Sequence, residues 1–350
     1  MRRSKEYYAD LFARLGERLE GFGTTSPTRA VAEAAVAANP WFTLSDVRFA
    51  VDALRRSMLD AEVLKEWLAR YETVGRPCGR RVAVIMAGNI PLVGFADLLY
   101  VVASGNIPFV KPSSKDSVLM AYVVGLLREL APGVPVEHYV PGGRYDAAIA
   151  TGSDNTGRYF HALFDGIPSL IRGSRGSVAL LTGDETEDEL RSLGRDMFRY
   201  SGLGCRNVGL VFVPQACDLD RFARTVAPAR EEVNPKYYNN YRSLRAQLRA
   251  SGAPFCDGGT FVVTEGEQFP VALSNIVAYR YGRVEEAYAW LKEHDGKVQC
   301  VVGRDALHPR AVGFGEGQTP RPWDYPDGRD VMEFLASVSP AETDHGTTEL

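Results

Sequence analysis

Hydrophobic positions in the first 78 residues recur at the three- and four-residue spacing of amphipathic helices. One such pattern runs from Glu6 to Leu19, a second begins near Thr43 or Ser45, and a third begins at about Asp60. Thr43 and Ser45 are residue types that accept hydrogen bonds at helix N-termini. We therefore expect a helical N-terminal segment over residues 1–78, broken at its end by Gly75, Arg76 and Pro77. Its apolar positions are Tyr7, Leu11, Leu15 and Leu19, then Val47, Val51, Leu54 and Met58, then Val63, Trp67 and Tyr71.

From residue 79 on, short apolar runs alternate with longer amphipathic segments. The run from Arg81 to Ala87 is almost continuously apolar, as in a strand that is covered on both faces. This alternation is typical of a parallel sheet flanked by helices, and it predicts an α/β domain over residues 79–200. Strands are expected at 81–87, 107–110, 135–140 and 177–181, and helices at 92–103, 117–130 and 185–200.

A second α/β pattern covers residues 201–310 and is long enough to form its own lobe. The last segment, residues 311–350, is rich in Gly, Pro and acidic residues. We expect it to be loop-rich and to wrap a surface or pack on a partner. Strands of the second pattern are expected at 208–213, 261–264, 275–280 and 298–302, and helices at 219–229, 235–250 and 284–293.

Length and composition narrow the class of protein. At roughly 150 residues per domain, 350 residues suggest about two domains. The formal net charge is −4 and no block is dense in Lys and Arg, which argues against a nucleic-acid partner. No apolar run approaches the ~20 residues of a membrane span, and no apolar core follows the charged start of the chain. We expect a soluble, cytoplasmic protein.

Five cysteines, an odd number spread along the chain, do not form a disulfide framework. Four of them lack a CxxC partner and a histidine at ligand spacing, so no metal site is expected. These four, which we expect to be small buried or partly buried residues, are Cys78, Cys217, Cys256 and Cys300.

Cys205 differs because it lies between a predicted helix and a predicted strand, flanked by glycines that allow a sharp turn. Arg206 adds positive charge that favours the thiolate, the reactive form of cysteine. Local composition leaves two interpretations open: a nucleophile, or a cysteine that merely fills a tight turn.

The sequence lacks the G-x-G-x-x-G pattern of an ordinary Rossmann phosphate site. The glycines of residues 313–317 follow no predicted strand. Residues 151–157 could instead present backbone N–H groups at a helix start, although such a run also forms ordinary turns.

Five stretches, taken together and in order, resemble the aldehyde dehydrogenase superfamily. They are most similar to the acyl-CoA reductase family typified by the long-chain fatty-acid reductase subunit of bacterial luminescence. The resemblance covers nearly the whole chain and implies an α/β fold with two Rossmann-like parallel-sheet lobes and an N-terminal helical segment. The stretches are residues 39–43, 87–95, 104–116, 201–207 and 323–328.

The resemblance also implies residue roles. Cys205 corresponds to the nucleophile, and Asn89 to the asparagine whose amide holds the developing oxyanion together with the backbone N–H of the nucleophile. The segment 79–200 becomes the cofactor-binding domain and 201–310 the catalytic domain. The residues implied in cofactor binding are Lys111, Ser113, Ser114, Gly152 and Ser153. Lys111 matches a lysine that bonds the adenosine ribose. Gly152 and Ser153 match the residues that start the helix over the pyrophosphate.

Two departures from the hydrolytic members of the superfamily bear on the chemistry. Ser114 stands where those enzymes commonly carry a glutamate that would repel a 2′-phosphate, so NADPH is expected rather than NADH. Residues 170–175 replace the Glu-Leu-Gly-Gly motif and contain no acid, so the base that activates water is missing. Glu265 and Glu267 fall near the position of a glutamate that orients the nicotinamide ribose, and both also suit a solvated loop.

The predicted function is an NADPH-dependent acylating reductase that converts a fatty acyl-CoA to the aldehyde through a Cys205 thioester intermediate. Two alternatives remain: an acyl-phosphate reductase of the same fold, and a non-catalytic acyl-binding scaffold in a reductase complex. The acyl donor is CoA or an acylated partner protein. A homodimer, or a subunit of a reductase complex, is the default expectation for assembly.

Overall fold

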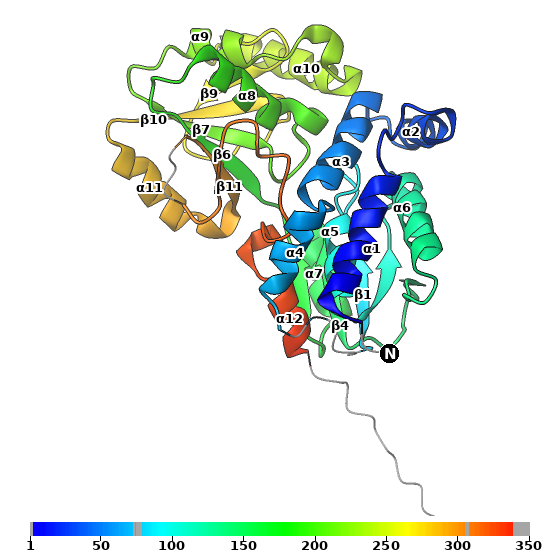
Figure 1. Cartoon of the computed structure of the whole chain (residues 1–350). Helices are drawn as coiled ribbons and strands as arrows, with labels where there is room; N and C mark the ends of the chain where they lie inside the picture. The colour runs from blue at the N-terminus through cyan, green and yellow to red at the C-terminus, as the bar shows by residue number, and fades with distance from the viewer. Residues whose placement is uncertain (1–2, 73, 75–78, 305–307, 339–350) are drawn as a thin grey trace, which may run out of the picture.

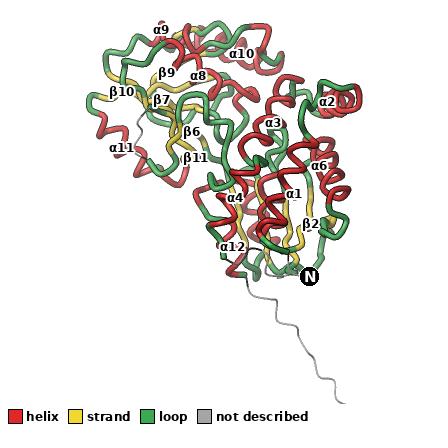
Figure 2. Tube along the Cα trace, in the orientation of Figure 1, coloured by secondary structure: helices red, strands yellow, loops and turns green. Residues whose placement is uncertain are grey.

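A computed structural model describes residues 3–72, 74, 79–304 and 308–338 of the chain. The chain forms two lobes, each built around one sheet, and the N-terminal helices lie beside the first sheet (Figure 1). Coloured by secondary structure, the strands separate into these two groups (Figure 2). The expected α/β fold with two parallel-sheet lobes and N-terminal helices is therefore present. Cys78 and the predicted break at residues 75–77 lie outside the described residues.

The three predicted N-terminal helices are confirmed, and a fourth helix lies between the first two. Thr43 rather than Ser45 caps the second predicted helix, where its Oγ1 accepts from the Asp46 N–H at 3.0 Å. The unpredicted helix has a weak pattern because its buried residues are only Ala32 and Ala35. The four helices are α1 (Lys5–Arg18), α2 (Ser26–Ala38), α3 (Leu44–Ser57) and α4 (Ala61–Ala69).

The first sheet is five-stranded and parallel, with the strand order β3-β2-β1-β4-β5. The strand expected at 135–140 shortens to two residues at the sheet edge. Two strands that the pattern did not predict, one of them the alanine-rich Ala147–Thr151, complete the other side. The elements are β1 (Arg81–Ile85), α5 (Phe95–Ala103), β2 (Ile107–Lys111), the 3₁₀ turn η1 (Ser114–Asp116), α6 (Ser117–Leu130), β3 (Glu137–His138), β4 (Ala147–Thr151), α7 (Asp154–Leu163) and β5 (Ser169–Arg172).

The second sheet is seven-stranded, with the order β12-β11-β6-β7-β10-β9-β8, and only β8 pairs antiparallel. Helices pack on both of its faces, as the two separate buried clusters of this lobe show. Its elements are β6 (Gly176–Leu180), α8 (Glu187–Phe198), the 3₁₀ turn η2 (Arg199–Gly202), β7 (Val208–Pro214), α9 (Leu219–Val226), α10 (Pro235–Ser251), β8 (Cys256–Asp257), β9 (Val262–Glu265), β10 (Asn275–Tyr281), α11 (Val284–Glu293), β11 (Val298–Val302) and β12 (Ala311–Val312).

The change from one sheet to the other falls between Arg172 and Gly176. Strand β6 and helix α8, which we expected in the cofactor-binding domain of residues 79–200, therefore belong with the second sheet. The expectation failed because an apolar strand carries no information about which sheet it joins. β6 pairs with β7 and β11, which follow it in the chain.

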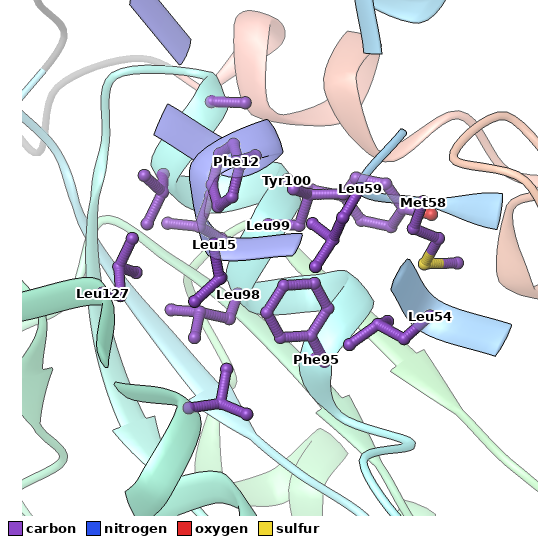
Figure 3. Packing of buried hydrophobic residues seen from close by; sticks show 14 of the residues in the cluster. Phe12, Leu15, Leu54, Met58, Leu59, Phe95, Leu98, Leu99, Tyr100 and Leu127 are labelled. Carbon is purple, nitrogen blue, oxygen red and sulfur yellow. The ribbon is translucent and has the colours of Figure 1, made fainter. Parts of the chain in front are cut away.

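The largest buried cluster joins the N-terminal helices to one face of the first sheet. Phe12 and Leu15 of α1 meet Phe95 and Leu98 of α5 in this cluster (Figure 3). The described part of the N-terminal helical segment is thus part of the core of the first lobe. The opposite face of the sheet is covered by α7, whose Phe160 packs against β1 and β4.

The described C-terminal segment begins on the second lobe, where β12 pairs with β11, and its end packs on the first lobe. Helix α12 (Val331–Ser337) contributes Val331, Met332 and Leu335 to the large cluster. The hydroxyl of Tyr325 accepts from Trp67 Nε1 of α4 at 2.8 Å in the buried interior. We expected a loop-rich C-terminal segment and did not predict α12, because this helix is too short to show a clear apolar period. Across the described part of the chain, no helix is long and apolar enough to cross a membrane.

Leu335→Ala tests whether α12 is part of this core. Leu335 is fully buried, so its truncation should lower the free energy of unfolding by about 2–5 kcal/mol, as for other buried leucines. Glu333→Ala on the exposed face of the same helix should change it by no more than about 0.5 kcal/mol. Urea denaturation of the two variants measures both values, and equal small effects would mean that α12 is not docked.

Candidate active site

Cys205 lies in a tight loop between η2 and β7. Tyr200 and Ser201 both have φ of +56°, a left-handed conformation that is costly for residues other than glycine. Gly202 continues the left-handed run with φ of +67°. Three consecutive residues of this kind reverse the chain direction after α8, and they bring Cys205 back to the amino end of β7.

Asn207 holds this loop in shape. Its side chain is buried, its Oδ1 accepts from the Gly204 N–H at 2.8 Å, and its Nδ2 donates to the carbonyls of Asp196 and Arg199, each at 2.9 Å. The amide therefore satisfies the last carbonyls of α8 and fixes the residue before the nucleophile. The sequence placed Asn207 in a motif without a role. Its buried hydrogen bonds supply the role.

Ser177 holds the other side of Cys205. Its hydroxyl is fully buried, donates to the Cys205 carbonyl at 2.9 Å and accepts from the Cys300 N–H at 3.2 Å. Both neighbouring ladders shift register beside Ser177, on the β11 side and on the β7 side. The hydroxyl thus replaces backbone partners that the two bulges remove.

The loop after β1 reaches the nucleophile loop from the first lobe. Asn89 Nδ2 donates to the carbonyl of Leu203 at 2.5 Å, two residues before Cys205. A primary amide carries two N–H groups, so one remains for another acceptor. The structure therefore brings together Cys205 and Asn89, the two residues implied in catalysis.

Asp116 anchors the loop that carries Asn89. Its Oδ2 accepts from the Leu92 N–H at 2.7 Å, and Leu92 has a left-handed φ of +57°. A Cβ on Gly88 would lie 2.5 Å from Ser113 Cβ, so the loop packs directly on the 113–116 turn. The segment implied in cofactor binding and the segment implied in oxyanion binding are thus in contact.

An apolar pocket of about 150 Å³ opens beside Cys205. Helix α3 forms one wall, the 90–93 loop and α5 form a second, and the segment from Gln318 to Pro326 closes the third. We call it the acyl pocket. Its apolar side chains include Leu54, Met58, Ile90, Leu92, Ala96 and Tyr100.

Burial raises the pKa of the Cys205 thiol, while the positive charge of Arg206 acts in the opposite direction. The sequence-based expectation that Arg206 favours the thiolate has the correct sign, but desolvation outweighs it. The thiol is therefore neutral at rest, and the thiolate fraction grows as pH rises.

A buried ion pair joins residue 172, of the segment 170–175, to helix α5. Arg172, at the end of β5, donates from Nη1 to both carboxylate oxygens of Asp97 at 2.8 Å. Both side chains are less than 10% exposed. Because Arg172 engages the Asp97 carboxylate, that group is not free to take a proton from water.

The residues implied in cofactor binding gather at the carboxyl edge of the first sheet. Ile85 pairs with Lys111 on one side and with Ala150 on the other, so β1, β2 and β4 end at the same level. Ligands of open α/β sheets bind at this edge. Ser113 caps η1, Gly152 donates to the Arg172 carbonyl at 3.1 Å, and Ser153 caps α7.

These residues suit an anionic group of a bound cofactor. Lys111, Ser114 and Lys115 are exposed, and Lys111 makes no ion pair within the described residues. The first N–H groups of α7 face the same edge, as an anion requires. Asp154, the first residue of α7, lies at the same edge, where its Oδ1 accepts from the Ser174 N–H at 2.8 Å.

Neither glutamate near the expected ribose position makes a contact that indicates a ligand. Glu265 pairs with Arg280 at 3.1 Å, and the carbonyl of Glu267 accepts from Trp290 Nε1. Among the residues that the structure describes, no cluster of three His, Cys, Asp or Glu side chains could hold a metal ion.

Comparison with known proteins identifies the fold. No protein-family model and no curated protein matches the sequence. The structure is similar to aldehyde dehydrogenase 21 from Physcomitrella patens in complex with succinate (TM-score 0.65, 13% identity, covering 95% of this chain and 84% of that one). It is also similar to an acetylating aldehyde dehydrogenase from Geobacillus thermoglucosidasius (TM-score 0.60, 12% identity, 90% and 83%). A third similar structure is an aldehyde dehydrogenase from Mycobacterium tuberculosis with NAD⁺ (TM-score 0.62, 14% identity, 89% and 78%). The chain has the aldehyde dehydrogenase fold.

Asp116→Asn tests the anchor of the Asn89 loop through pH-dependent stability. Burial raises the pKa of Asp116 from 3.8 to about 7, against the hydrogen bond from Leu92. Between these values the unfolded carboxyl is ionised and the folded one is protonated, so rising pH lowers the free energy of unfolding by about 1.4 kcal/mol per unit. Asp116→Asn should remove this contribution to the slope and leave that of Asp196, whose pKa burial also raises to about 7.

Urea denaturation at a series of pH values between about 4 and about 7 measures the slope. Asp10→Asn, at an exposed position of α1, is the matched control and should leave the slope as in the wild type. An unchanged slope in Asp116→Asn would show that this carboxyl titrates normally in the folded protein.

Proposed function

We propose that the protein is an acylating reductase, which takes an acyl group onto Cys205 and reduces it to the aldehyde with NADPH. The observation that carries the proposal is the position of Cys205, between an apolar pocket and the Asn89 loop. The aldehyde dehydrogenase fold supports an oxidoreductase of this class.

In the first step, the Cys205 thiolate attacks the carbonyl carbon of the acyl donor. The oxygen of the tetrahedral intermediate accepts from the second N–H of Asn89 and from the backbone N–H of Cys205. Each donor of this kind is worth about 3–4 kcal/mol of barrier. Ser177 and Asn207, which hold the loop on both sides, keep these donors fixed so that no reorganisation is needed during the reaction.

The second step releases an aldehyde rather than an acid. Hydrolysis of a thioester needs a base to activate water, and the Asp97 carboxylate is bound by Arg172 instead. The acyl pocket is also lined mainly by apolar side chains, which keeps water from the thioester. The acyl group on Cys205 therefore persists until it is reduced.

Lys111, Ser113, Ser114, Gly152 and Ser153 would hold the cofactor at the carboxyl edge of the first sheet. Lys111 and Ser114 would contact the adenosine ribose, and the start of α7 would lie against the pyrophosphate. When bound, the nicotinamide supplies the hydride. The absence of a carboxylate at Ser114, with Lys115 beside it, favours NADPH over NADH.

The acyl group is expected to be aliphatic because the pocket beside Cys205 is apolar. An acyl-CoA and an acylated partner protein are both compatible donors. One of the similar structures is described as an acetylating aldehyde dehydrogenase, and it has the same fold. An acyl-phosphate reductase is the second candidate, and the unpaired Arg206 beside the thiol is the feature that would suit a phosphate.

Cys205→Ala should abolish NADPH oxidation in the presence of acyl-CoA, because no acyl-enzyme can form. The measurement is absorbance at about 340 nm with acyl-CoAs of graded length. Cys217→Ala, which removes a partly buried thiol outside the site, should keep the activity. Reduction that continues without the Cys205 thiol would rule out the covalent route.

Ser114→Glu should shift cofactor preference toward NADH. The new carboxylate would repel the 2′-phosphate and bind the ribose hydroxyls instead, so KM for NADPH should rise about tenfold or more. Steady-state kinetics with both cofactors measure the ratio, and Ser114→Gln is the neutral control of similar size. A preference that does not move would place the 2′-phosphate elsewhere.

A further inference from the structure

A second pocket, of about 230 Å³, lies on the far side of the acyl pocket wall. The two pockets share Arg206, Gln299 and Asp324. We call the second one the polar pocket, because a guanidinium, an amide and a carboxylate line it together with Arg310 and the aromatic residues Trp323 and Tyr325.

Arg206 is the cation that both pockets share, and its charge is not neutralised. Its Nε donates to the Gly317 carbonyl at 2.5 Å, and within the described residues no carboxylate lies within ion-pair distance of its guanidinium. Arg310, which lines the polar pocket, is paired with Asp295. A guanidinium that keeps free donors at a pocket wall is available to a ligand.

Arg206 also lies close to the reacting sulfur. It follows Cys205 in the chain, and its charge is the strongest of those that lower the pKa of this thiol. In the tetrahedral intermediate, the sulfur of Cys205 and the departing sulfur of the donor are bonded to the same carbon. The field that acts on the Cys205 thiolate therefore acts on the departing thiolate as well.

We infer that Arg206 is a catalytic residue that stabilises the negative charge of the departing thiolate of a thioester donor. The polar pocket then holds the polar arm attached to that thiol. This inference rests on the proposed acyl transfer to Cys205. The acyl chain of the donor would lie in the acyl pocket, and its arm would lie in the polar pocket, which shares a wall with the first.

Bonds, electrons and protons balance in this acyl transfer. Cys205 loses its proton and attacks as a thiolate, so that its sulfur forms a bond to the carbonyl carbon. The carbon–sulfur bond of the donor breaks, and its electron pair leaves on the donor sulfur. The negative charge thus passes from one sulfur to the other beside Arg206, and the proton that Cys205 released ends on the free thiol.

The lining of the polar pocket favours a neutral arm over a phosphate. Asp324 lies in the shared wall, and its carboxylate would oppose a leaving group that carries two negative charges. A thiolate carries one charge, which the single free guanidinium of Arg206 balances. A pantetheine-type arm offers amide groups to Gln299 and Arg310 without adding charge.

The test is a leaving-group series with one acyl group. Wild type, Arg206→Gln and Arg206→Lys are acylated in single-turnover reactions with a nitrothiophenyl thioester, whose thiolate is stable alone, and with an S-acyl-pantetheine, whose thiolate is not. Arg206→Gln should lose about 100-fold in acylation rate with acyl-pantetheine but only about threefold with the nitrothiophenyl thioester. Arg206→Lys, which keeps the charge, should restore most of the loss.

Two controls separate other roles of Arg206. The pH dependence of Cys205 alkylation by iodoacetamide measures the thiol pKa in each variant, so that rates are compared at equal thiolate fraction. Ala311→Trp, which fills the polar pocket beside Arg310, should raise KM for acyl-pantetheine and leave that for the nitrothiophenyl thioester unchanged.

Equal losses with both donors would overturn the inference, since Arg206 would then act only on Cys205 or on the 317 loop. A wild-type protein that is not acylated by either thioester would overturn the proposed function itself, and the inference with it. Acylation of the wild type by both donors, with no dependence on Arg206, leaves the proposed function standing and rejects the inference alone.

Discussion

The hydrogen bond from Asn89 to the Leu203 carbonyl joins the two lobes at the place where chemistry is proposed. Asn89 belongs to a loop of the first sheet, and Leu203 belongs to the nucleophile loop of the second lobe. Each loop is strained in itself, with left-handed residues at Leu92 and at Tyr200 and Ser201. Such conformations persist only where the surroundings over-determine them, and here Asp116 and Asn207 supply those surroundings. The relative position of Cys205 and the oxyanion donors depends on this joint.

A second constraint concerns buried charge. A buried arginine and a buried aspartate are each costly alone, and Arg172 and Asp97 are stable only as a pair. The pairing engages both oxygens of the Asp97 carboxylate. Arg206, in contrast, forms no ion pair within the part of the chain that the structure describes, and its Nε donates to a backbone carbonyl. One cation is thus neutralised and the other is available, which suits a transfer of charge between two sulfurs.

The sequence predicted most of the architecture because periodicity is strong where helices and strands bury large side chains. It missed α2 and β4, where alanines give little contrast between the two faces. It assigned β6 to the wrong lobe, since pairing partners are set by tertiary structure. For the site, the motif order predicted Cys205 and Asn89, whose loops the structure places in contact. The roles of Ser177, Asp116 and the Arg172–Asp97 pair were not accessible, because each depends on a contact between residues far apart in the chain.

The most direct measurement of the central claim is intact-mass spectrometry of the protein after mixing with an acyl-CoA in the absence of cofactor. We expect a mass increase equal to one acyl group, located on the peptide that contains Cys205, and its loss as aldehyde once NADPH is added. An unmodified protein with every acyl-CoA and acyl-pantetheine tried, or an adduct on another cysteine, would contradict a Cys205 acyl-enzyme.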